Sequence, residues 1–249
     1  MSPGEALAVF AAGLAGGTVN VIVGSGSLIT FPTLLAAGFE PVRANVTNTI
    51  GLVAGTITGT IGYRRELEGQ GGRVRSLGVF SLAGGITGAM LLLVLPGSVF
   101  ETVVPLLILM ACGLVALQPR LSRPAPHPDS DREHSRWLPV TVFLTGVYGG
   151  YFGAAQGVIL IALLGIFLED HLQRLNALKN LLAALVNGVA ALIFVFAADV
   201  AWGAAATLAA GAIVGGHVGA KVARRIPTPV LRTVIVVVGT AVAVRLLVG

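Results

Sequence analysis

Charged residues are scarce in this sequence. Asp, Glu, Lys and Arg make up 11% of the 249 residues, whereas hydrophobic residues make up 55% and the mean hydropathy is +0.90. Soluble domains carry roughly 25% charged residues, so this composition excludes an ordinary soluble monomer. The apolar runs recur at close to the roughly 20 residues that cross a bilayer, and this pattern predicts an all-α polytopic membrane protein.

Cysteine is nearly absent, and the basic residues fall outside the apolar runs. Cys112 is the only cysteine, which excludes an intramolecular disulfide. The first residues carry no basic segment of the kind that opens a signal peptide, so we expect no cleaved leader. The formal net charge is +5, but its location in loops is typical of a membrane protein and argues against a nucleic-acid partner.

The apolar runs fall into two groups separated by a polar segment. Residues 118–137 are rich in Pro, Ser and charge, and we interpret them as a cytoplasmic connector between a first transmembrane repeat at 1–117 and a second at 138–249. The predicted apolar segments are 5–23, 28–37, 44–63, 74–95 and 100–117 in the first half, and 138–168, 176–197, 202–220 and 230–248 in the second.

The two halves resemble each other. Three residue types recur at one offset of 131 positions, in the pairs Gly26 and Gly157 (157−26), Arg43 and Arg174 (174−43), and Asn45 and Asn176 (176−45). Each half also has the same order of a glycine-rich break, a short apolar run, a polar turn and a long helix. These observations predict an internal repeat.

Loop charges predict the orientation of the halves. Arginine and lysine cluster in three connections, which the positive-inside rule places in the cytoplasm. Counting crossings from these loops puts 39–42 outside and 169–173 inside, so 138–168 must start and finish on one side as a broken, V-shaped helix pair. We therefore expect two inverted repeats, each a V-shaped pair plus three transmembrane helices, as in many secondary transporters. The clusters are Arg64, Arg65, Arg73 and Arg75; Arg120, Arg123, Arg132 and Arg136; and Lys221, Arg224 and Arg225.

The first break, "VGSGSLITFP", places Gly24, Ser25, Gly26 and Ser27 between apolar runs. Irregular backbone at membrane depth occurs only where protein or a water-filled cavity satisfies its polar groups. The amides after the break would lie at a helix N-terminus, where they attract anions, and the serine hydroxyls would add donors. The alternative is a break that serves packing alone.

The second break, "GAAQG", carries Gln156 and Gly157. By the offset of 131, Gln156 corresponds to Ser25 (156−131). Both serine and glutamine form hydrogen bonds, but glutamine cannot replace serine as a nucleophile. The presence of these two residues at matching positions therefore favours a binding site over a catalytic site. We predict no catalytic residue, no metal site and no cofactor.

Polar residues also open the long helix of each half. Thr47 and Asn48 lie in the first turns of the first long helix, and Lys179 and Asn180 lie in the first turns of the second. Lys179 would lie about 10 Å inside its helix at 1.5 Å per residue. A lysine at that depth is a candidate countercharge for an anion, and the alternative is a side chain that reaches back to the interface.

Three further polar residues lie within predicted spans: Asn20, Asn187 and His217. We interpret them first as partners in interhelical hydrogen bonds. His217 is also a weak candidate for proton coupling, because imidazole titrates near neutral pH. Glycines recur every four residues in several spans, including Gly51, Gly55 and Gly59, and Gly211, Gly215 and Gly219. This spacing predicts close helix packing.

These features resemble the sulfite exporter TauE/SafE family of bacterial membrane proteins. The likeness rests on "AGLAGGTVNVIVGSGSLITFPTLLAAGFEPVRANVTNTIGLVAGTITGTIGY" and on "GVYGGYFGAAQGVILIALLGIFLEDHLQRLNALKNLLAALVNGVAALIFVF". The family's glycine-rich break followed by proline is present at Gly24, Gly26 and Pro32. The second copy departs from it, because Leu163 stands where the proline would be. The resemblance implies a proton-coupled exporter of a small sulfur-containing anion in the bacterial inner membrane.

Combining the residues with the resemblance, we expect an anion site at the midplane between the two breaks. Its predicted residues are Gly24, Ser25, Gly26, Ser27, Thr47, Asn48, Gln156, Gly157, Lys179 and Asn180. Two other functions stay open. An intramembrane serine hydrolase would use Ser25 or Ser27 as nucleophile and His217 as base, and a membrane protein of assembly or maturation would not transport at all.

Overall fold

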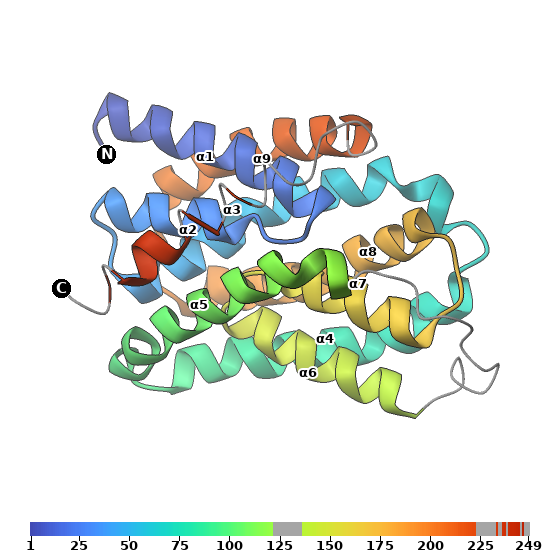
Figure 1. The fold of residues 1–249 in the computed structure, drawn as a ribbon. Coiled ribbons are helices and arrows are strands. Elements are labelled where there is room, and N and C mark those ends of the chain that lie inside the picture. Colours follow the sequence, from blue (N-terminus) through green and yellow to red (C-terminus); the bar gives the residue numbers. More distant parts are fainter. Residues whose placement is uncertain (122–135, 223–232, 234–235, 238, 245, 247–249) are drawn as a thin grey trace.

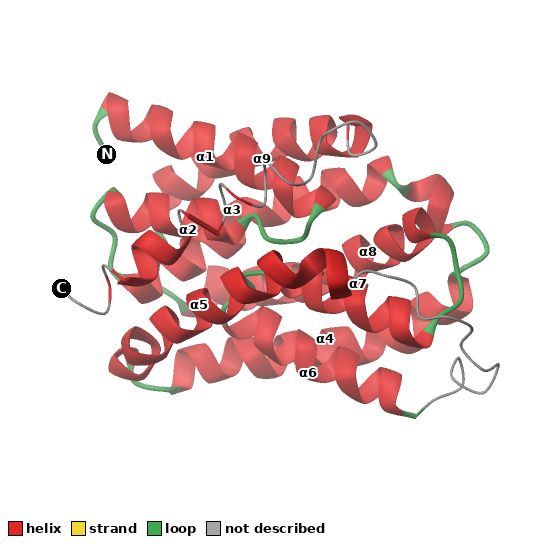
Figure 2. Cartoon of the chain, in the orientation of Figure 1, coloured by secondary structure: helices red, strands yellow, loops and turns green. Residues whose placement is uncertain are grey.

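The computed structural model describes residues 1–121, 136–222, 233, 236–237, 239–244 and 246. Within this part the chain is helical, with no strand (Figures 1 and 2). The elements are α1 (Pro3–Ile22), α2 (Ser27–Ala36), α3 (Pro41–Gly62), the 3-10 helix η1 (Arg64–Leu67), α4 (Gly71–Val94), α5 (Gly97–Leu121), α6 (Trp137–Tyr151), α7 (Gln156–Phe167), α8 (Leu172–Ala197) and α9 (Trp202–Val222).

The predicted fold class, an all-α polytopic membrane protein, is confirmed. Among the described residues, α1, α4, α5, α8 and α9 are long and apolar enough to cross a bilayer. The 22-residue α3 is not in this set, although it is long enough. One row of its polar side chains, which includes Asn45, Asn48 and Thr56, is buried inside the bundle. A polar row that faces other helices rather than lipid is the arrangement expected of a functional interior.

Both predicted broken pairs turn back on themselves. The N-terminus of α1 and the end of α2 lie at one end of the bundle, and α6 and α7 begin and end at the opposite end (Figure 1). The arms are unequal: α1 has 20 residues and α2 has 10, whereas α6 has 15 and α7 has 12. The chain then crosses through α3, α4 and α5 in the first half, and through α8 and α9 in the second (Figure 1).

The two ends of the bundle differ in charge. One end carries the α3–α4 and α7–α8 connections, where Arg64, Arg65, Arg73, Arg75 and Arg174 accompany Glu66, Glu68, Glu169 and Asp170. The opposite end carries the N-terminus and the α2–α3, α4–α5 and α8–α9 connections, with Glu5, Glu40, Glu101, Asp199 and a single arginine, Arg43. The positive-inside rule therefore predicts that the arginine-rich end faces the cytoplasm.

Glycine faces bring neighbouring helices into backbone contact, as their spacing predicted. A Cβ at Gly211 would overlap the Phe10 carbonyl of α1, and one at Gly55 would lie 2.5 Å from the Ala212 carbonyl oxygen of α9. On the other side of the bundle, a Cβ at Gly84 would overlap the Phe143 carbonyl of α6. These glycines have a packing role, because any side chain would force the helices apart.

Some predicted boundaries were wrong or lie outside the described residues. The helix predicted to end at residue 117 continues to Leu121, so the first four residues of the predicted 118–137 connector are helical. Residues 122–135 lie outside the described residues, as do nine of the 19 residues of the predicted span at 230–248. The predicted connector and the division into two repeats therefore remain predictions.

Candidate functional site

The two helix breaks begin with the same backbone geometry and differ before the next helix, where Gly26 is right-handed (φ −58°) and Ala155 is left-handed (φ +58°). After α1, Gly24 adopts φ +84°, and the carbonyl of Val19 accepts hydrogen bonds from the amides of Val23 (2.8 Å) and Gly24 (3.1 Å). After α6, Gly153 adopts φ +77°, and the carbonyl of Tyr148 accepts from Phe152 (2.9 Å) and Gly153 (3.1 Å). Glycine is needed at both points, because side chains disfavour a positive φ.

This shared geometry corrects the predicted alignment of the breaks. Gly153 matches Gly24 at an offset of 129 (153−24), and the start of α7 at Gln156 matches the start of α2 at Ser27 (156−27). The long helices keep the offset of 131, since α3 begins at Pro41 and α8 at Leu172 (172−41). Gln156 therefore corresponds to Ser27 and not to Ser25.

The two breaks touch through their glycines. The amide of Gly157 donates to the carbonyl of Gly24 at 3.1 Å. A Cβ placed on Gly157 would lie 2.5 Å from the Cα of Gly24, a distance at which atoms overlap. Gly24 and Gly157, both predicted site residues, thus bring the irregular segments of the two halves together inside the bundle.

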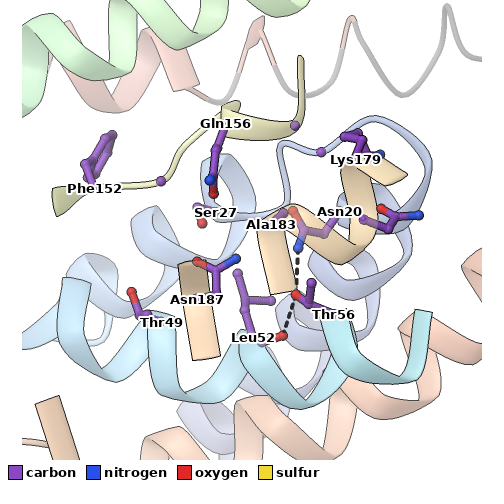
Figure 3. A pocket seen from close by; sticks show the side chains of 14 residues that line it. Asn20, Ser27, Thr49, Leu52, Thr56, Phe152, Gln156, Lys179, Ala183 and Asn187 are labelled. Carbon is purple, nitrogen blue, oxygen red and sulfur yellow. Dashed lines mark hydrogen bonds between the residues drawn. The ribbon is translucent and has the colours of Figure 1, made fainter. Parts of the chain in front are cut away.

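A small polar cavity lies beside this contact (Figure 3). Its volume is about 10 Å³, which is roughly the space for one water molecule. At this volume the cavity must widen to admit a polyatomic anion. The lining residues are Asn20, Gly24, Ser27, Thr49, Leu52, Thr56, Phe152, Gly153, Gln156, Gly157, Lys179, Asn180, Ala183 and Asn187.

Equivalent positions of the two halves line the cavity in pairs. On the long helices α3 and α8, three lining pairs are 131 residues apart. At the breaks, two lining pairs are 129 apart. These pairs are Thr49 and Asn180 (180−49), Leu52 and Ala183 (183−52), Thr56 and Asn187 (187−56), Gly24 and Gly153 (153−24), and Ser27 and Gln156 (156−27). The cavity is thus lined by residues of both halves that recur at these two offsets.

Lys179 lines the cavity and is 1% exposed. Its Nζ donates to the carbonyl of Val21 at 3.2 Å, and Nδ2 of Asn180 donates to the same oxygen at 3.4 Å. That carbonyl lies in the last turn of α1, where the break leaves it without an intrahelical partner. The ion pairs recorded among the described residues do not include Lys179. The alternative that the side chain of Lys179 reaches back to the membrane interface is therefore wrong.

Ser27 lines the cavity, but Asn48 supports it from behind. Nδ2 of Asn48 donates to Oγ of Ser27 at 3.1 Å, and its Oδ1 accepts from the hydroxyl of Thr30. The predicted residue Thr47 faces elsewhere, because its hydroxyl oxygen accepts from the amide of Ala201 at 3.1 Å. The sequence predicted that Asn48 and Thr47 bind the anion directly, but neither residue lines the cavity.

Gln156 is 2% exposed and points from the second break toward Ser27 (Figure 3). Its Nε2 has no hydrogen-bond partner in the described part of the chain. A buried amide donor without a partner is costly, which makes a ligand acceptor the natural partner. Gly149 leaves the room for this side chain, since a Cβ there would overlap the glutamine amide.

The remaining residues of the first break do not line the cavity. The hydroxyl of Ser25 is buried without a partner among the described residues, and the amide of Gly26 donates to Oδ1 of Asn20 at 3.4 Å. The amides of Leu28 and Ile29 donate to the carbonyls of Ser25 and Gly26. Several amides that we expected to be free for an anion are therefore occupied, and the cavity offers mainly side-chain donors.

The sequence missed part of the polar lining. Asn20 does form the predicted interhelical bond, from its Nδ2 to Oγ of Thr56 at 3.0 Å, but it also lines the cavity, as does Asn187. Thr49 and Thr56 were not predicted. Their spacing from Asn45 along one face of α3 was a signal that could have identified them.

His217 lies exposed on α9 and does not line the cavity. No group of three metal-binding side chains occurs among the residues that the structure describes.

Comparisons with known proteins agree with this architecture. The family model of the sulfite exporter TauE/SafE matches residues 9–246. The chain is 28% identical to probable membrane transporter protein ORF9 of a Sinorhizobium species, over 96% of this chain and 91% of the relative. It is 25% identical to probable membrane transporter protein YfcA of Escherichia coli K12, over 96% and 88%.

A probable membrane transporter protein of Haemophilus influenzae is 26% identical, over 92% of this chain and 89% of the relative. No solved structure matches the chain significantly. The apolar helices and these transporter relatives together make the chain an integral protein of the bacterial inner membrane. With its family model matched over almost the whole length, this chain belongs to the sulfite exporter TauE/SafE family.

Proposed function

We propose that the protein is a proton-coupled secondary transporter that exports a small sulfur-containing anion, such as sulfite or an organosulfonate. The anion would bind in the cavity between the two helix breaks. Membership of the family supports transport of this class of anion. The observation that carries the assignment to the cavity is Lys179, a buried lysine with no recorded carboxylate partner in the described chain.

The cavity has the donor set that a compact oxyanion requires. Lys179 supplies the countercharge, Asn180 and Gln156 supply amide donors, and Ser27 supplies a hydroxyl. No Asp or Glu of the described chain lines the cavity. A site with donors and no anionic side chain favours an anion over a cation.

We propose further that the two halves act as inverted repeats around this cavity. The matched break geometry and the paired lining positions support this arrangement. In transporters of this kind, one repeat or bundle rocks against the other about a site near the midplane. The small volume of the cavity fits an occluded state, from which either end could open.

The hydrolase alternative finds little support. A serine nucleophile needs a base within hydrogen-bond reach, but no histidine lines the cavity and the hydroxyl of Ser27 contacts Asn48. The second break has glutamine where the first has Ser27. A role in assembly or maturation is less favoured, because the relatives are described as probable transporters.

Transport by the purified protein in liposomes tests the proposal. Vesicles loaded with ³⁵S-labelled sulfite, sulfate, thiosulfate or methanesulfonate would be diluted, and efflux compared with that from protein-free vesicles. We expect rapid, saturable efflux of sulfite or the sulfonate. If the protein accelerates none of these anions, the proposed function is wrong.

A further inference from the structure

We infer that Lys179 carries the transported proton as well as the countercharge, so that one anion and one proton bind and leave together. The inference rests on the proposed function and names the group that would couple it to protons. The sequence had suggested His217 for this role. His217 lies exposed on α9, whereas Lys179 lies in the cavity.

Lys179 is the single titratable side chain among the described residues that line the cavity. Every other lining residue is an amide, a hydroxyl residue, a glycine or an apolar residue. None of these gains or loses a proton near neutral pH. Among the described side chains that line this cavity, the amine of Lys179 is therefore the group that can hold a proton.

In the part of the chain that the structure describes, the recorded contacts of Lys179 include no group of opposite charge. From α1 it receives the neutral carbonyl of Val21. The ring of Tyr63, after α3, packs with Val21 and Ala177, and a phenol is neutral near pH 7. Along α8, the preceding charged side chain is Arg174, which is paired with Asp170.

An anion changes the balance between the two forms of the lysine. With an anion bound, the ammonium has a partner of opposite charge inside the protein. Without one, a lone ammonium at membrane depth is costly, whereas a neutral amine is not. When the anion leaves, the N–H bond breaks, its electron pair stays on Nζ, and the proton passes to water on the side of release.

This linkage makes the anion and the proton travel in the same direction. A loaded site holds one ammonium and one monoanion and has no net charge, and the empty site holds a neutral amine. Neither form would respond to the membrane potential when the substrate is a monoanion. Export would then be driven by the anion gradient and by any excess of protons inside.

Replacing Lys179 with arginine separates the loaded and empty steps. Arginine binds an anion but does not release its proton in proteins. The protein with bound anion can therefore switch between its inward-facing and outward-facing states, whereas the empty protein, with a buried charge, cannot. For Lys179→Arg, we expect exchange of internal for external labelled sulfite to be reduced but still measurable, because a planar guanidinium differs from a compact ammonium. Net efflux into sulfite-free buffer should fall at least about tenfold relative to exchange. Lys221→Arg, at the exposed end of α9, is the matched control and should keep the wild-type ratio.

A measurement on the wild type decides the question if the arginine variant loses both activities. With equal pH on both sides, and the pH chosen so that the anion is a monoanion, valinomycin and potassium impose a membrane potential. Net efflux that is insensitive to the potential supports the inference. Net efflux that the potential accelerates, or a Lys179→Arg variant with the wild-type ratio of net efflux to exchange, overturns it. A wild type that moves no anion contradicts the proposed function instead.

Discussion

At the scale of residues, the two serines of the first break have different surroundings. Ser27 lines the cavity, whereas the hydroxyl of Ser25 is buried outside it without a described partner. Ser27→Ala should weaken sulfite binding several-fold, because a neutral hydrogen bond contributes about 1 kcal/mol. Ser25→Ala should leave binding unchanged. Equilibrium binding of labelled sulfite to the purified variants measures both, and a larger loss for Ser25→Ala would contradict the assignment.

The sequence identified part of this residue-scale picture. Lys179, Asn180, Gln156 and Ser27 were predicted from their types and depth, and all four line the cavity. It could not separate them from Asn48, which supports Ser27 instead of facing the cavity. Which face of a helix points inward depends on how neighbouring helices pack. A polar residue in a span therefore predicts a buried side chain but does not predict the group that it hydrogen-bonds.

At the scale of elements, the contact between the two breaks should be sensitive to a single methyl group. Gly157→Ala places a Cβ against Gly24, and overpacking of this kind costs about 1–3 kcal/mol. We expect a lower melting temperature and a large loss of sulfite efflux. Gly165→Ala, on the same helix, meets no atom within 4 Å and is the matched control. Equal behaviour of the two variants would mean that the close approach has no role.

An ion-pair cluster connects the two halves at the arginine-rich end. Asp170, between α7 and α8, contacts Nη1 of Arg73 at 2.7 Å and Nε of Arg174 at 2.9 Å, and its side chain is 12% exposed. Burial opposes ionisation of this carboxyl. The hydrogen bonds from Arg174 and Arg73 outweigh burial and hold the pKa of Asp170 below its ordinary value of 3.8.

Because the folded state lowers this pKa, the carboxylate stabilises the fold above the unfolded pKa and loses that contribution as pH falls through the folded value. Asp170→Asn should reduce stability by about 1–3 kcal/mol at pH 7, and the difference from wild type should shrink in acid. Asp199→Asn is the control, because its pair with Arg43 is exposed (78% and 42%). Melting temperatures between pH 7 and acid measure both. A deficit for Asp170→Asn that does not shrink in acid would contradict this account.

The sequence predicted most elements but not their alignment. The apolar runs, the two breaks and the polar first turns of the long helices all correspond to observed helices and loops. The offset of 131 holds for α3 and α8 but is two residues too long at the breaks. Glycines are frequent enough for Gly26 and Gly157 to match by chance, and the positive φ values that mark the true equivalents are not visible in a sequence.

At the scale of the whole molecule, the charge difference between the two ends predicts a definite topology. In a Cys112→Ala background, cysteines replacing Glu68 and His171 should react only with reagents that reach the cytoplasm. Cysteines replacing Pro96 and Asp199 should react from outside. Each half supplies one position of each kind, and all four are exposed. Labelling of whole cells and of inverted vesicles measures this, and reaction of Glu68→Cys and His171→Cys from opposite sides would exclude the arrangement.

The central claim is that the anion binds beside Lys179 in the cavity between the breaks. Equilibrium binding of ³⁵S-labelled sulfite to purified protein tests it most directly, by comparing Lys179→Met with Lys221→Met. A charge-assisted contact contributes about 1.5–3 kcal/mol, so Lys179→Met should lose at least about tenfold in affinity. It should keep its melting temperature, because it removes a buried charge, and Lys221→Met should bind like wild type. If folded Lys179→Met binds sulfite as tightly as Lys221→Met, the anion does not bind beside this lysine.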